Sequence, residues 1–244
     1  NLSVHDNRIL NTLLYTVSDI ERMAVHAMSV AKAVALIQKA ATDEAALKAI
    51  DGAVFNFAAG EYVLADEALA LSYDAAEPVK LTFKGEEGTV FSGNETHSIM
   101  TVSGADVSME GITITKSVAT ETKTGAIKVS GENSKLTLSK CTLLENTVNG
   151  EQIFCAGVAV TEGAELVVTE CKAVDNSAFS ASVFYIDGAK VNVTATSFEG
   201  NWTNDDAGVM LLEGDQRSSF ANCEFTSNAA YKHGMIKHAS GKTT

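Results

Sequence analysis

Short segments in which apolar and polar residues alternate recur along the second half of the chain. Alternation with a period of two is typical of β-strands. Each segment ends in an apolar residue that is followed three positions later by Asn or, once, by Ser. The four clearest segments span residues 135–146, 165–176, 190–201 and 218–228, and their final Asn residues are 30, 25 and 27 positions apart. The strands therefore belong to a repeat.

A second set of strands repeats with nearly the same period. Each of these begins with Gly or Ser and continues with apolar residues. The small residues are Gly125, Gly157, Ser182, Gly208 and Gly234, at steps of 32, 25, 26 and 26. Self-similarity at a fixed period of this length indicates a solenoid. The strands are short and rich in Val, Ile, Thr and Phe, which excludes helical repeats.

A coil of roughly 25 residues with three short strands predicts an all-β solenoid, a single-stranded parallel β-helix. Equivalent residues then stack at the inter-strand spacing of about 4.8 Å. We expect Asn146, Asn176, Asn201 and Asn228 to form an inward amide ladder, with Ser117 at the equivalent position of an earlier coil. A second interior column would contain Cys141, Cys171, Thr196 and Cys223.

Three tetrapeptides carry a family resemblance: FSGN (91–94), FEGN (198–201) and FTSN (225–228). With the Gly-small-apolar strands, they resemble the F-x-x-N and G-G-A-I repeats of polymorphic outer-membrane and adhesin-like proteins. The resemblance implies a right-handed β-helix of the pectate-lyase-like superfamily and a secreted or cell-surface location. We assign residues 51–244 to this β-helix domain. Its last strand has no evident cap, which indicates a longer protein or a stacking interface.

Residues 1–50 form a separate N-terminal helical segment in this interpretation. Apolar or small residues recur at steps of three and four, which predicts an amphipathic helix over 7–40. A second short helix begins at Thr42 and ends near Ile50. Residues 8–30 resemble one helix of PhoU-like domains, although Val25 replaces the Asp of that family's metal motif. We predict no metal site here, and we expect the long helix to self-associate with a second copy.

The composition narrows the classes of partner. The formal net charge is −13, from 31 acids and 18 bases, so phosphate groups would be repelled and nucleic acid is excluded. The acids suit solubility, calcium binding or a basic partner. No apolar stretch is long enough to span a membrane. The four cysteines show no metal-binding spacing, which favours free buried thiols, with a Cys141–Cys171 disulfide as the alternative.

One cluster is a candidate for ligand chemistry. Stacking of coils would bring the turn with Asp205 and Asp206 beside the turn with Lys232 and His233. The same stretch holds Trp202 and Asn204, and an exposed indole with polar neighbours suits carbohydrate binding.

Three functions remain open from the sequence. The favoured one is a secreted or cell-surface binding or adhesion module, without catalysis, for a carbohydrate or another cell-surface ligand. The alternative is a polysaccharide-active lyase or glycoside hydrolase, although the motifs of polygalacturonases are absent. The third is a structural spacer. No cofactor is expected unless the acids hold calcium.

Overall fold

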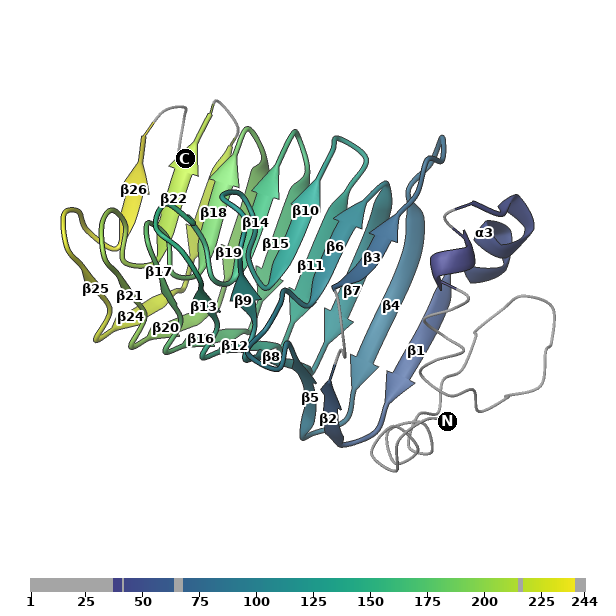
Figure 1. The fold of residues 1–244 in the computed structure, drawn as a ribbon, viewed down its shortest axis with the longest axis horizontal. Coiled ribbons are helices and arrows are strands. Elements are labelled where there is room, and N and C mark those ends of the chain that lie inside the picture. Colours follow the sequence, from purple (N-terminus) through teal and green to yellow (C-terminus); the bar gives the residue numbers. More distant parts are fainter. Residues whose placement is uncertain (1–36, 41, 64–67, 215–216, 240–244) are drawn as a thin grey trace.

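The structure, a computed structural model, describes residues 37–40, 42–63, 68–214 and 217–239. Every pairing between its described strands is parallel, and in the three long sheets each strand pairs with its equivalents in the neighbouring coils. Three long sheets thus run along one solenoid, and a set of very short strands forms a fourth side (Figure 1). The predicted all-β parallel solenoid is confirmed.

The strands fall into four groups in chain order. The first sheet contains β1 (Ala53–Phe57), β4 (Val79–Gly85), β7 (Ala105–Glu110), β11 (Lys135–Ser139), β15 (Glu165–Thr169), β19 (Lys190–Thr194) and β23 (Ser218–Ala221). The second contains β2 (Gly60–Val63), β5 (Thr89–Ser92), β8 (Thr113–Thr115), β12 (Thr142–Leu144), β16 (Lys172–Val174), β20 (Ser197–Glu199) and β24 (Glu224–Thr226). The third contains β3 (Leu69–Ser72), β6 (Met100–Ser103), β10 (Ile127–Ser130), β14 (Val158–Thr161), β18 (Phe184–Asp187), β22 (Met210–Glu213) and β26 (Ile236–His238). The fourth side contains β9 (Val118–Ala119), β13 (Thr147–Val148), β17 (Ser177–Ala178), β21 (Trp202–Thr203) and β25 (Ala229–Ala230).

The core lies inside the solenoid, where alternate residues of every sheet meet. The parallel register places each inward residue on its equivalent one coil away, which buries apolar side chains in continuous columns. One such column contains Leu81, Val107, Leu136, Leu166 and Val191. The alternating pattern in the sequence is therefore the alternation between core and surface.

The Asn ladder is present as predicted. Asn146 Nδ2 donates to Asn176 Oδ1 at 2.9 Å, and Asn176 Nδ2 donates to Asn201 Oδ1 at 2.9 Å. Asn201 Nδ2 continues to Asn228 Oδ1 at 2.8 Å. Ser117 occupies the equivalent position and donates its backbone N–H to Asn146 Oδ1 at 3.2 Å. The Asn94 of FSGN is exposed and stands outside the ladder.

A residue with left-handed backbone precedes each ladder position. Lys116, Glu145, Asp175, Gly200 and Ser227 all have φ between 51° and 66°. One such residue turns the chain sharply, so that the following Asn points inward while the residue itself points outward. Non-glycine residues are uncommon in this conformation, and here the buried amide that follows holds the corner in place.

The cysteine column is also present, with one difference. Cys141 and Cys171 are buried, whereas Cys223 is only half-buried because it lies in the last described coil. All four cysteines are free thiols, and the backbone N–H of Cys141 donates to Cys171 Sγ at 3.3 Å. The structure therefore has the thiol arrangement rather than the disulfide alternative.

A short helix packs against the N-terminal coil. Helix α3 (Glu44–Ile50) begins after Asp43, whose Oδ1 accepts from the backbone N–H groups of Ala45 and Ala46 at 2.9 and 3.0 Å. Asp43 rather than Thr42 is thus the N-cap. Ala46 and Ile50 are buried against the solenoid end (Figure 1).

Most of the predicted long helix lies outside the described residues, including the 8–30 segment that resembles PhoU-like domains. Of the 7–40 span, residues 37–40 are described, and they are helical. Ile37 and Ala40 are buried in the main core, and Ile37 O accepts from Tyr73 Oη at 3.5 Å. This end of the segment packs on its own solenoid, and self-association of the rest stays a prediction.

Candidate functional site

The fourth side of the solenoid carries the one indole of the chain, that of Trp202. In β21 the side chains alternate, so that Trp202 points outward with 46% of its surface exposed and Thr203 points inward. The backbone N–H of Trp202 donates to Asn176 O at 3.0 Å. Because Trp202 directly follows the ladder residue Asn201, the amide ladder fixes the position of the indole.

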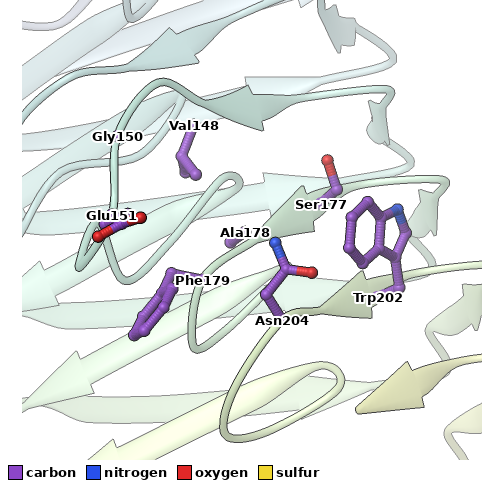
Figure 2. A pocket seen from close by; sticks show the side chains of 8 residues that line it. All are labelled: Val148, Gly150, Glu151, Ser177, Ala178, Phe179, Trp202 and Asn204. Atoms are coloured by element: carbon purple, nitrogen blue, oxygen red, sulfur yellow. The ribbon is translucent and has the colours of Figure 1, made fainter. Parts of the chain in front are cut away.

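An open groove of about 380 Å³ lies beside this indole (Figure 2). Three successive coils line it, with Val148, Gly150, Glu151, Ser177, Ala178, Phe179, Trp202 and Asn204. In Figure 2, the Asn204 amide lies between the rings of Trp202 and Phe179, and the Glu151 carboxylate lies on the loop opposite the indole. Apolar and polar groups are thus both within reach of one ligand.

One wall of the groove is a loop that is longer than its equivalents in later coils. The step from Asn146 to Asn176 is 30 residues, against 25 for the next step, and four of the five additional residues fall before Cys155, in the stretch that contains loop 149–153. Ile153 anchors this loop because its side chain is buried. The backbone N–H of Phe179 also donates to Ile153 O at 3.3 Å, which holds the loop against the next coil.

The two candidate acids contact basic side chains from the next coil. Asp205 forms an ion pair with Lys232, and Asp206 Oδ1 lies 2.8 Å from His233 Nδ1. Lys237 Nζ lies 2.7 Å from Asp206 Oδ2. The predicted proximity of these two turns is therefore confirmed, and Lys237 is an additional member that the sequence analysis did not include.

These ion pairs also set the protonation of the groups. Burial raises the pKa of Asp206, but Lys237 and His233 outweigh this effect, so its pKa lies below the usual value. The Asp205 carboxylate raises the pKa of Lys232. Asp206 is thus held ionised, which does not suit a proton donor, and both Asp205 and Asp206 are engaged by basic side chains. Within the described part of the chain, no group of three or more His, Cys, Asp or Glu side chains is arranged to hold a metal ion.

The six candidate residues separate into two groups. Trp202 and Asn204 line the groove, whereas Asp205, Asp206, Lys232 and His233 form the ion-pair network of the neighbouring turns. The sequence analysis missed the other six groove residues, among them Glu151, Ser177 and Phe179. The longer step between ladder residues was the signal that could have drawn attention to the loop with Glu151.

Comparison with known protein families agrees with this architecture. The family model described as the right handed beta helix region matches residues 81–225, which is more than half of the chain. The chain belongs to the right-handed β-helix family. No curated protein and no solved structure matches this β-helix significantly. The helices that the structure describes include none that is long and apolar enough to cross a membrane.

A second polar cluster of this β-helix lies on the outer face of the third sheet. Tyr185 Oη donates to Glu213 Oε2 at 2.7 Å and lies 3.4 Å from Asp187 Oδ2. Lys123 Nζ reaches Asp187 Oδ2 at 2.6 Å from a loop two coils earlier. Burial, with the neighbouring Glu213, raises the pKa of Tyr185. The buried phenol is therefore a neutral hydrogen-bond donor, and the cluster fastens the loop of Lys123 to the sheet.

Proposed function

We propose that this β-helix is a carbohydrate-binding module that works outside the cell or on the cell surface, with the Trp202 groove as its ligand site. One observation carries the proposal: a single large indole stands exposed on the wall of an open groove that also presents an amide, a hydroxyl and a carboxylate. Binding sites typically combine apolar rings with a few polar groups that fix the orientation of the ligand.

The groups of the groove match the two kinds of surface that a sugar presents. The flat face of the indole can cover the C–H face of a pyranose ring, which removes apolar surface from water. Asn204 can both donate and accept hydrogen bonds, the Ser177 hydroxyl can do the same, and Glu151 can accept. A sugar ring on Trp202 would therefore have partners for its hydroxyl groups on two sides.

Binding without catalysis is the form of the proposal that these contacts favour. Hydrolysis of a glycosidic bond needs two carboxyl groups on opposite sides of the bond. Glu151 is the one carboxylate among the residues that line the groove, and Asp205 and Asp206 are engaged by Lys232, His233 and Lys237. The extracellular location rests on the resemblance of the repeats to adhesin-like proteins.

Trp202 is the sole tryptophan of the chain, so intrinsic fluorescence reports on the groove alone. Titration with neutral, amino and acidic oligosaccharides should change this fluorescence and give saturable heats by calorimetry. Trp202→Ala should weaken binding at least about tenfold, as expected for a central aromatic contact. Lys172→Ala, an exposed change on the neighbouring sheet, is the matched control and should bind normally.

Two results would overturn the proposal. One is the absence of binding to every oligosaccharide in the panel. The other is saturable binding that leaves Trp202 fluorescence unchanged and survives Trp202→Ala, because the ligand would then occupy another surface.

A further inference from the structure

Aromatic side chains occupy outward positions in three successive coils of the fourth side. The register pairs Ser177 with Trp202 and Trp202 with Ala229. Two residues further along each coil, Phe179 and Asn204 are equivalent, and Tyr231 follows Ala229 at the same spacing. Past the strands, Asp205 N–H donates to Phe179 O at 2.9 Å, which keeps Asn204 beside Phe179, whereas Lys232 N–H donates to Asp205 O at 2.8 Å, which places Tyr231 one residue further along, beside Asp205.

Phe179 and Tyr231 lie two residues further along their coils than Trp202 does, so the three aromatic side chains form a staggered row in successive coils along the solenoid axis. Successive coils are about 4.8 Å apart, so the row from Phe179 through Trp202 to Tyr231 extends over about 10 Å. Tyr231 is 80% exposed, which makes it the most exposed of the large hydrophobic residues among those described. Such a row can contact successive units of a chain-like ligand, whereas a single indole contacts one.

The charges around the row are acidic and uncompensated. Glu151 lies in the groove. Glu145, Asp175 and Glu199 are exposed at or next to the left-handed corner that precedes each ladder residue and so the strands of the fourth side. None of these four carboxylates forms an ion pair with a described residue. Lys232 is the nearby base on the next coil, and Asp205 neutralises it. An anionic ligand would meet repulsion here.

We infer that the ligand is a glycan chain without acidic groups, which lies along the solenoid axis across the coils of Phe179, Trp202 and Tyr231. The inference rests on the proposed carbohydrate-binding function and adds its substrate class and direction. The carboxylates do not repel neutral sugars, and they attract protonated amino sugars. Uronic or sulfated sugars must bring negative charge beside Glu151.

A charge series of oligosaccharides tests the substrate class. Cello-oligosaccharides, glucosamine oligomers and galacturonate oligomers of equal length are titrated at low ionic strength with Trp202 fluorescence as the readout. The neutral or amino series should bind at least about tenfold more tightly than the galacturonates, and added salt should narrow this difference by screening the charges. Galacturonates that bind equally well or better would overturn the inference and leave the proposed function standing. Absence of all binding would instead refute the proposed function.

Glu151→Gln isolates the charge in the groove. The variant should lower the discrimination against galacturonates roughly two- to fivefold, the size expected for one exposed charge. Glu87→Gln, an exposed acid in a turn of an early coil, is the matched control and should leave it unchanged. Equal effects of the two variants would mean that only the net charge of the chain matters, against the inference.

Ligand length tests the direction. Tyr231→Ala should weaken binding of a hexasaccharide severalfold and leave a disaccharide unaffected, because the shorter ligand is held by Trp202. Tyr231 is so exposed that its removal takes nothing from the core. Equal loss for both ligands, or no loss for the hexasaccharide, would contradict a ligand that runs along the axis.

Discussion

Replacement of Asn176 by Ala removes the middle of the amide ladder. The Asn176 Oδ1 atom accepts from the backbone N–H of Asn146 at 3.1 Å and from its Nδ2 at 2.9 Å. Its own Nδ2 donates to Leu143 O at 2.9 Å and to Asn201 Oδ1 at 2.9 Å. The side chain is fully buried, so water cannot replace these partners.

The expected cost follows from the groups that lose partners. Alanine leaves the backbone N–H of Asn146 and one hydrogen of its Nδ2 buried without an acceptor. Each unsatisfied buried group costs about 1–3 kcal/mol, so the two groups together should lower the free energy of unfolding of Asn176→Ala by roughly 2–6 kcal/mol. The loss of packing at this corner adds to the same effect.

The matched control is Asn192→Ala, which removes an exposed amide that accepts from Ser219 Oγ at 2.9 Å. This change should alter the free energy of unfolding by less than about 0.5 kcal/mol. Urea unfolding followed by circular dichroism and by Trp202 fluorescence compares the two variants. If Asn176→Ala is no less stable than Asn192→Ala, the ladder does not hold the coils together and the reasoning fails.

Three other predictions follow from buried or paired groups. Thiol reagents should label Cys223 first in the native protein, since it is half-buried and burial raises the pKa of Cys155 to about 12; labelling of all four at one rate would contradict the burial. Ser117→Ala should leave the free energy of unfolding unchanged or raise it by up to about 1 kcal/mol, because the buried Ser117 Oγ has no hydrogen-bond partner among the described residues; a clear loss in urea unfolding would reveal one. The lowered pKa of Asp206 stabilises the fold above its unfolded value of 3.8, and this contribution is lost as the pH falls through the folded value. Asp206→Asn should therefore reduce the acid sensitivity of the urea midpoint, and an unchanged pH profile would refute the role of its ion pairs.

The ladder and the interior columns could be predicted from the sequence because they depend on the repeat alone. Once the Asn residues are aligned, the coil spacing places each amide on the next, and no other property of the fold is needed. Cys141 and Cys171 follow in the same way. The exposure of Cys223 did not follow, because it depends on the position of its coil in the solenoid rather than on its place in the repeat.

The groove could be predicted only in part. Trp202 and Asn204 stood out because an exposed indole with polar neighbours suits ligand binding, and both residues line the groove. Phe179 did not stand out, because a phenylalanine in an apolar repeat is normally part of the core. Its outward direction depends on the two-residue strand after the ladder, which is too short for a pattern of alternation. The proximity of Asp205 and Asp206 to Lys232 and His233 could be predicted from the stacking of coils, and their role in ligand binding stays a prediction.

The anchored loop 149–153 has a consequence for how such a surface can change. Both of its ends join coil positions that the ladder and the adjacent strands determine, so its length is independent of the interior columns. Residues can be exchanged, added or removed between Asn149 and Ile153 without altering a single stacked side chain. Grooves of different widths and charges can therefore be formed on one unchanged core. Antibodies likewise place variable binding loops on a constant scaffold.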